Sequence, residues 1–337
     1  MAARFIPLTC SGHTRPVVQL SFSQMQDDEE PNYLLVSSCK DGNPMLRDWT
    51  GDWVGTFIGH KGAVWSTKLC ADTSKAATGS ADFTAKVWDT YTGEVLHSFP
   101  HNHIVRTVSI SPNASHLLTA GHEKKIRLFD LAKPDAEPSF LYKRDGGDAK
   151  VSHDGTIKSV VWDRARAMAV SCGDDKMVRW WDLRSQKETH SMSVPDPIIS
   201  MELSAPMETL CLTAGKTVAF VPLEAPPSTT SSLPGPTPPD IEPGPLHVLR
   251  LPYNVSSASI HPIWGDRFIT GSTDDPWVRV HGYQHGEERE MYKGHHGPVH
   301  CVEYSPDGEM YASGSEDGTI RLWQTTPGKA YGLWRAA

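Results

Sequence analysis

The sequence predicts an all-β protein, a seven-bladed β-propeller, and two observations carry that prediction. The chain of 337 residues divides into seven repeated units, each about 40 to 50 residues long, which is the length of one four-stranded blade. Within each unit, short alternating apolar runs are separated by turn residues, and a helical period is not sustained anywhere. Because the units account for nearly the whole chain, we expect one domain over residues 1–337.

Each unit opens on a Gly-His pair or its remnant and closes on Trp-Asp or a related pair. The opening pair is intact at Gly12-His13, Gly59-His60 and Gly294-His295. We expect the blades to begin near residues 13, 60, 101, 153, 195, 251 and 295. Their third strands end in Trp88-Asp89, Phe129-Asp130, Trp181-Asp182 and Trp323-Gln324, with degenerate endings near Arg47, Phe220 and Val280. This pattern is typical of WD40 repeats, so the predicted fold is a seven-bladed WD40 β-propeller.

The ring needs a closing strand, and both termini offer one. Ile6–Cys10 precedes the first repeat as a fourth strand precedes each later repeat. Lys329–Trp334 aligns with Glu94–Phe99, the fourth strand of the second unit. The sequence leaves open which of the two completes blade seven.

One segment interrupts the period. Residues 224–245, Glu224 to Pro245, are rich in Pro, Ser, Thr and Gly and cannot supply a core-facing pattern. We expect a disordered loop insertion between the third and fourth strands of blade five. The simplest interpretation is a solvated loop without a partner, and the alternative is a proline-recognition or phosphorylation site.

Three units combine a His, a hydroxyl, an Asp and a Trp, and the first three of these are the residue types of a hydrolase triad. A catalytic triad occurs once per active site, so a constellation repeated in several blades indicates a structural cause. We expect a buried hydrogen-bond chain from Asp to His to hydroxyl to Trp, and more dependence on apolar packing in the other blades. The twelve residues are His60, Thr78, Asp82 and Trp88; His153, Ser171, Asp175 and Trp181; and His295, Ser313, Asp317 and Trp323.

Composition and missing motifs disfavour several functions. Lys and Arg number 32 against 40 Asp and Glu, and the formal charge of -8 disfavours a free-standing nucleic-acid binder. No G-x-G-x-x-G, Walker or G-x-S-x-G motif is present. The pairs His101/His103 and His295/His296 lack companions at metal-ligand spacing. We therefore expect no enzymatic activity, no cofactor and no metal.

Cysteine usage and hydropathy indicate the compartment. The six cysteines lie far apart without a C-x-x-C pair, which is typical of reduced core residues. No secretory leader and no apolar run of membrane-spanning length is evident. We expect a soluble protein of the cytoplasm and nucleus, with no membrane insertion.

A candidate interface follows from the geometry of a propeller. The narrow face of a propeller is the one built around the central channel by the turns that lead into each first strand and by the turns between second and third strands. Side chains that flank the buried residue of each first strand point toward this narrow face, as does the residue before each turn Asp. Trp and Arg are frequent interface hot spots, and the mixture of charges suits an acidic or mixed-charge peptide. The alternatives are that Trp65 packs only against the next blade and that the cations form a solvated surface. The predicted protein-binding residues are Lys40, Trp65, Arg106, His122, Lys158, Asp174, His300 and Glu316.

Three stretches are similar to one known family. Leu35–Trp65, Lys75–Asp89 and His300–Gln324 closely resemble the serine/threonine kinase receptor-associated protein family, also called Unr-interacting protein. The resemblance implies a non-catalytic scaffold that joins the SMN complex through a Gemin subunit during assembly of spliceosomal ribonucleoproteins. It also implies an Unr-like RNA-binding partner and receptor kinases, with RNA bound only indirectly by a monomeric propeller.

Two other hypotheses stay open at this point. The chain also resembles the related seven-bladed family of translation initiation factor three, subunit I. Direct RNA binding by the propeller is the alternative of a different class, although the negative charge disfavours it.

Overall fold

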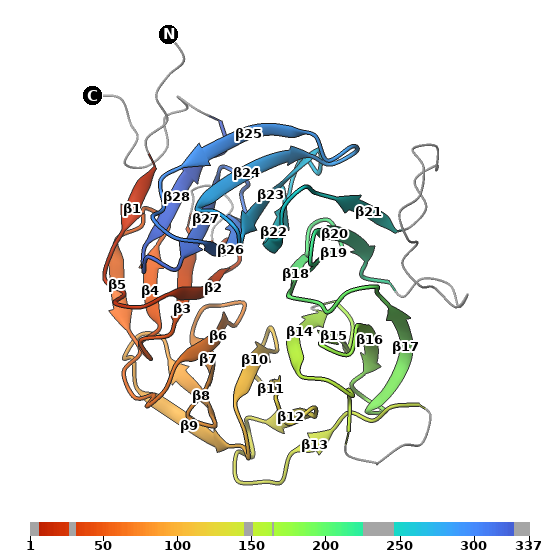
Figure 1. Ribbon diagram of the computed structural model, residues 1–337. Coiled ribbons are helices and arrows are strands. Elements are labelled where there is room, and N and C mark those ends of the chain that lie inside the picture. The colour runs from red at the N-terminus through yellow and green to blue at the C-terminus, as the bar shows by residue number, and fades with distance from the viewer. Residues whose placement is uncertain (1–6, 27–31, 145–150, 164, 225–245, 327–337) are drawn as a thin grey trace.

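The computed structural model describes residues 7–26, 32–144, 151–163, 165–224 and 246–326. Within these ranges the chain forms 28 strands in seven four-stranded antiparallel sheets. The sheets stand around a central axis as the blades of a ring (Figure 1). The predicted all-β, seven-bladed propeller is confirmed.

The first four blades follow one another along the chain. Blade one contains β2 (Val17–Phe22), β3 (Leu34–Cys39), β4 (Met45–Asp48) and β5 (Trp53–Thr56). Blade two contains β6 (Val64–Leu69), β7 (Lys75–Ser80), β8 (Thr84–Asp89) and β9 (Val95–Pro100). Blade three contains β10 (Val105–Ile110), β11 (His116–Gly121), β12 (Ile126–Asp130) and β13 (Ser139–Phe140). Blade four contains β14 (Ile157–Asp163), β15 (Met168–Gly173), β16 (Met177–Asp182) and β17 (Lys187–Ser193).

The remaining blades complete the ring. Blade five contains β18 (Ser200–Ser204), β19 (Thr209–Ala214), β20 (Thr217–Pro222) and β21 (His247–Arg250). Blade six contains β22 (Val255–Ile260), β23 (Arg267–Ser272), β24 (Trp277–Gly282) and β25 (Glu288–Lys293). Blade seven contains β26 (Val299–Tyr304), β27 (Met310–Ser315), β28 (Ile320–Gln324) and, from the N-terminal part of the chain, β1 (Leu8–Cys10).

The N-terminal strand closes the ring. β1 pairs antiparallel with β28, with Leu8 opposite Leu322 and Cys10 opposite Ile320. Of the two closing strands that the sequence offers, the structure therefore places the first in blade seven. The second, residues 329–334, lies outside the described residues.

The core lies between the blades. The cluster between blades four and five, for example, packs Val170 and Trp180 of one sheet against Leu210 and Val221 of the next. All six cysteines are buried and carry free thiols, as expected for core residues. The interrupted stretch of blade five falls between β20 and β21. Apart from Glu224, the residues of this predicted disordered loop lie outside the described ranges.

The first strand of each blade is called its inner strand. Most inner strands share an irregularity that positions side chains of the narrow face. In every blade except the fifth, the pairing of the first and second strands shifts by one residue directly after the first residue of the inner strand. Such a β-bulge re-aims the extra side chain and increases the local twist. The bulged positions include Trp65, Arg106, Lys158 and His300.

Candidate functional site

Blade two holds one of the predicted hydrogen-bond chains. His60 lies with Nδ1 2.7 Å from an oxygen of Asp82 and Nε2 2.6 Å from the hydroxyl of Thr78. The indole N–H of Trp88 donates to the same hydroxyl at 2.8 Å. Thr78 and Trp88 are fully buried, so each polar group of the chain meets a partner inside the blade.

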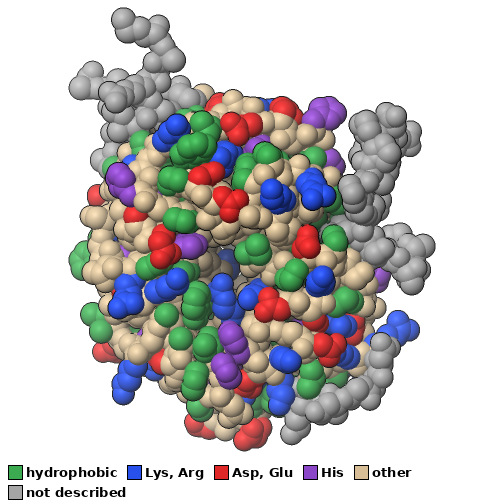
Figure 2. Space-filling view, in the orientation of Figure 1, with side chains coloured by type: hydrophobic (Ala, Val, Ile, Leu, Met, Phe, Trp, Pro, Cys, Tyr) green, Lys and Arg blue, Asp and Glu red, His purple; other side chains and the backbone are tan. Residues whose placement is uncertain are grey.

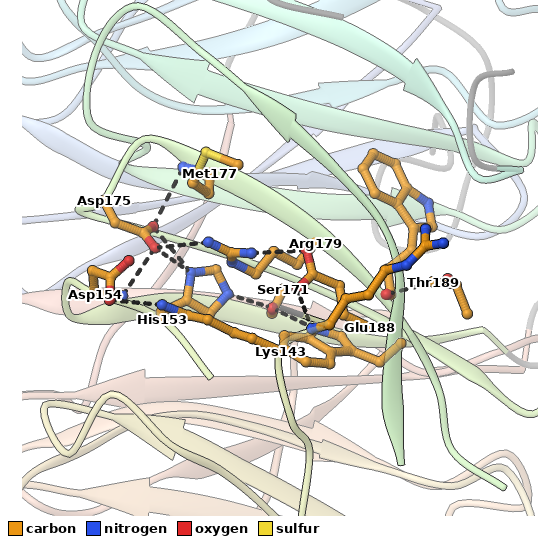
Figure 3. Close-up of polar contacts among 12 residues, drawn as sticks. Lys143, His153, Asp154, Ser171, Asp175, Met177, Arg179, Glu188 and Thr189 are labelled. Carbon is orange, nitrogen blue, oxygen red and sulfur yellow. Dashed lines mark hydrogen bonds and ion pairs between the residues drawn. The ribbon is translucent and has the colours of Figure 1, made fainter. Parts of the chain in front are cut away.

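Blade four repeats the arrangement (Figure 3). His153 lies between Asp175, 2.9 Å from Nδ1, and Ser171, 2.7 Å from Nε2, and the Trp181 indole donates to Ser171 at 2.8 Å. Arg179, beside this chain, donates to Glu188 at 2.8 Å.

Blade seven has the same geometry. His295 lies 2.7 Å from the Ser313 hydroxyl and 3.3 Å from Asp317, and Trp323 donates to Ser313 at 2.8 Å. Ser313 is completely buried, as is its counterpart in blade four. A nucleophile needs access to substrate, so this burial favours a structural role for these hydroxyls.

Blade one carries a shortened network and the residues nearest to a metal-ligand set. His13 lies 3.0 Å from Asp41 and 2.8 Å from Ser37. Arg47 stands at the sequence position of the missing Trp, and its guanidinium donates to the Gly51 carbonyl at 2.9 Å. Nitrogen, sulfur and oxygen atoms of His13, Cys39 and Asp41 lie within 4.8 Å of one another. Burial raises the pKa of the Cys39 thiol to about 12, which disfavours the thiolate that a metal requires. These side chains belong to the blade-one hydrogen-bond network.

Blades three and six keep part of the network although they lack the full pattern. In blade three, His101 still reaches the Thr119 hydroxyl at 2.8 Å. In blade six, the hydroxyl of Tyr253 lies 2.7 Å from the hydroxyl of Thr270 and 2.6 Å from Nε2 of His281. Tyrosine here takes the place of the opening His, and His281 that of the Trp. The repeat pattern gives no sign of this substitution, because Tyr253 and His281 are equivalent to His and Trp as donors and acceptors but not as residue types.

The eight predicted narrow-face residues come from two kinds of position. Trp65, Arg106, Lys158 and His300 occupy bulges of the inner strands, whereas Lys40, His122, Asp174 and Glu316 begin the turns after the second strands. Backbone hydrogen bonds hold each of these turns against the residues that precede the bulge, as from the Asp174 N–H to the Thr156 carbonyl at 2.9 Å. The structure therefore brings all eight to one face, around the axis.

Trp65 is the centre of an aromatic and cationic group. The Arg106 guanidinium lies 4.4 Å from the centroid of its ring, and the Lys40 ammonium lies 5.8 Å from it. Arg106 also donates to the Trp65 carbonyl at 3.4 Å. The three side chains come from three successive blades, so Trp65 contacts a neighbouring blade and faces the axis at the same time.

The other narrow-face residues are paired. Lys158 lies 3.2 Å from Asp174, and His300 lies 2.5 Å from Glu316. The His122 ring stacks on His103 with centroids 4.9 Å apart. Burial, together with the neighbouring His103 and nearby cations, lowers the pKa of His122.

Side chains of Lys and Arg gather at the central hollow over β6, β10 and β14 (Figure 2). A small cavity of about 70 Å³ opens there, lined among others by Trp65, Arg106 and Lys158. A larger cavity of about 390 Å³ opens from the opposite face. Lys68, Glu202 and Glu303 line both cavities and so lie between them along the axis.

His103 and Phe83 join the ring contacts of His122, although the strand pattern of the sequence does not predict them. The His103 ring lies 5.6 Å from that of Phe83 as well as stacking on His122. Both residues lie in turns, outside the alternation of the strands, although an exposed aromatic in a turn is itself a signal.

The described part of the chain holds no helix of the length and hydropathy that a membrane crossing needs. Residues 51–89, 93–130, 149–182 and 286–324 match the family of the WD domain, G-beta repeat. The repeats that match include those with the complete hydrogen-bond chains.

Curated relatives extend the likeness to the whole chain. The serine-threonine kinase receptor-associated proteins of Bos taurus and Homo sapiens are 46% identical to it over 336 residues, covering 99% of this chain and 87% of theirs. That of Dictyostelium discoideum is 43% identical over 320 residues, covering 94% and 98%. Eukaryotic translation initiation factor 3 subunit I of Culex quinquefasciatus is 28% identical over 337 residues, covering 94% and 95%.

Proposed function

Because the chain belongs to the family of serine-threonine kinase receptor-associated proteins, we propose that it is a non-catalytic scaffold in SMN-type assembly of spliceosomal ribonucleoproteins. Its partners in this proposal are Gemin-type assembly factors and an Unr-like RNA-binding protein, with receptor kinases as further partners. In this proposal the propeller is a monomer in the cytoplasm and nucleus, and it binds RNA only through these proteins.

One observation carries the choice of a protein-binding scaffold. Trp65 and Arg106 are held together by inter-blade contacts at the mouth of the channel, whereas the hydroxyls that resemble nucleophiles are buried inside the blades. A pre-positioned Trp and Arg are the side chains that most often dominate protein interfaces. The narrow face therefore supports recognition, while the buried networks support stability.

A tagged pull-down from native cytosolic extract, read by mass spectrometry, tests the proposal. The wild type is expected to retain Sm-assembly proteins, and the double variant Arg106→Glu, Lys158→Glu is expected to lose them. The matched control is Arg184→Glu, Lys187→Glu, which makes the same charge change at the outer end of blade four. Absence of Sm-assembly proteins from the wild-type sample would contradict the proposed function, and equal retention by all three would contradict the narrow-face site.

The second candidate is a subunit of a translation initiation factor 3 type complex. The similarity to subunit I spans nearly the full length of both chains, which favours this candidate over any function outside the two families. Co-sedimentation with small ribosomal subunits, without Sm-assembly proteins, would favour it over the first.

A further inference from the structure

The narrow end of the channel contains a cation without a counter-ion. Among the described residues, Arg106 makes no ion pair within 4.0 Å, and its side chain donates a single hydrogen bond, the long one of 3.4 Å to the Trp65 carbonyl. A guanidinium carries five N–H donors in a planar fork. Most of the hydrogen-bonding capacity of Arg106 is therefore unused inside the protein.

A second donor at the same place also lacks an acceptor. The indole Nε1 of Trp65 is buried and has no hydrogen-bond partner within the described chain. By contrast, the tryptophans of the three complete hydrogen-bond chains each donate to a buried hydroxyl, as Trp88 does at 2.8 Å. A buried N–H without an acceptor is costly, so such a group in a native structure needs an explanation.

The surroundings of these two donors are cationic. The Lys40 ammonium lies 5.8 Å from the centroid of the Trp65 ring and forms no ion pair among the described residues. Burial lowers the pKa of Arg106 to about 10, and the nearby Asp174 opposes this only in part. Asp174 itself is engaged by Lys158 at 3.2 Å. In a protein of formal charge -8, this local surplus of positive charge is set apart from the rest of the surface.

We propose that the narrow end of the channel is an anion site that takes the carboxylate of an Asp or Glu side chain of a partner protein, held between the Arg106 guanidinium and the Trp65 indole N–H. This inference rests on the proposed scaffold function and adds the chemistry of its partner. A carboxylate fits the planar fork of an arginine and accepts from several donors at once. The cavity of about 70 Å³ at these residues has room for a small group only.

The same contacts favour an acidic peptide over RNA. Bases bind single-strand sites by stacking on an open aromatic face. The Arg106 guanidinium already covers one face of Trp65 at 4.4 Å, so a base cannot stack on that face. Deeper in the channel, Glu202 and Glu303 disfavour further entry of an anion, so we expect one acidic side chain to seat at the mouth.

Fluorescence anisotropy of labelled hexaglutamate at low salt tests the site on the purified protein. We expect saturable binding that weakens about tenfold or more in Arg106→Gln. Trp65→Phe keeps the ring and removes only the N–H, and it is expected to weaken binding as well. Arg184→Gln changes an exposed arginine of blade four in the same way and is expected to bind as the wild type does.

Several outcomes would overturn the inference. Equal affinity of the wild type and both site variants for hexaglutamate would do so, and so would tighter binding of hexalysine or oligouridylate. If a phosphoserine peptide binds and hexaglutamate does not, the site takes phosphate and the inference of a carboxylate is wrong. If Arg106→Gln lowers the melting temperature, hexaglutamate binding by Trp65→Phe and Arg106→Lys tests the site instead. Lys keeps the charge but loses the planar fork, so weaker binding by both variants would support the inference and unchanged binding would contradict it.

The result is independent of the partner's identity. Hexaglutamate binding at Arg106 without Sm-assembly proteins in the pull-down would leave the anion site standing and contradict the proposed function. Recovery of those proteins by a variant that no longer binds hexaglutamate would contradict the anion site alone.

Discussion

Replacing Asp317 by Ala should lower the free energy of unfolding by about 2 kcal/mol. One oxygen of Asp317 accepts from the backbone N–H and the hydroxyl of Thr319, at 2.9 and 2.7 Å. The other accepts from the His296 N–H at 2.8 Å and lies 3.3 Å from His295. Each such bond contributes about 0.5–1.5 kcal/mol, and water replaces part of them in the variant because the turn is partly exposed. His295 also keeps its contact with Ser313.

Thermal denaturation followed by circular dichroism measures this effect. Unfolding entropy is about 2.1 cal/mol/K per residue, or about 0.7 kcal/mol/K for a chain of this length, so the melting temperature should fall by about 3 °C. Asp52→Ala is the matched control, because Asp52 is an exposed turn residue of blade one. Equal melting temperatures for Asp317→Ala, Asp52→Ala and the wild type would refute the reasoning.

The same variant has an expected pH dependence. Burial alone would disfavour the ionised form of Asp317, but hydrogen bonds from His296 and Thr319 outweigh it and lower its pKa from 3.8 to about 2. A carboxylate with a lowered pKa stabilises the fold above its unfolded pKa, and this contribution is lost as pH falls through the folded pKa. The difference between wild type and variant should be constant above a pH of about 5 and shrink toward 2. A constant difference over that range would mean that the charge of Asp317 contributes nothing.

Two further substitutions test buried groups elsewhere in the ring. Tyr253→Phe should cost about 1–2 kcal/mol, because it removes the hydroxyl that lies 2.6 Å from His281; an unchanged midpoint in urea denaturation would show that blade six does not depend on this network. Burial, reinforced by Glu303, raises the pKa of Glu202 well above its ordinary value. Its stabilising contribution is complete below the unfolded pKa and is lost as pH rises through the folded pKa, so Glu202→Gln should melt higher than the wild type at pH ~8 and equally at pH ~4. Equal melting at both pH values would contradict a buried charge at Glu202.

The fold and the three complete hydrogen-bond chains could be predicted because both depend on short-range spacing. In each complete blade the hydroxyl precedes the Trp by ten residues, which the structure places on neighbouring strands of the same sheet, as in the hairpin that joins Ser313 to Trp323. The sequence could not decide the closing strand, because Ile6–Cys10 and Lys329–Trp334 carry the same alternation. The pairing of Leu8 with Leu322 depends on how the whole ring closes.

Contacts between blades could not be predicted from the repeat. Strand alternation placed Trp65 and Arg106 on one face, but the 4.4 Å contact between them depends on the spacing of two separate sheets. The bulges that position these residues also left no signal, since a bulge changes pairing without changing the order of apolar and polar residues. The role of Tyr253 could not be predicted for a different reason. Its hydroxyl makes the hydrogen bond to Thr270 that a histidine makes in the complete blades, but tyrosine does not fit the residue pattern of the repeat.

Stability and recognition occupy different positions of the same repeat. The buried networks join the opening His to the second and third strands, whereas the bulged residue is an extra one without an opposite number on the second strand. The side chain at the bulge can therefore differ between blades without altering the register of the sheet, as Trp65, Arg106 and Lys158 do in blades two, three and four. A propeller built in this way can acquire a new partner by changes at the bulges alone, while the networks that hold each blade stay the same.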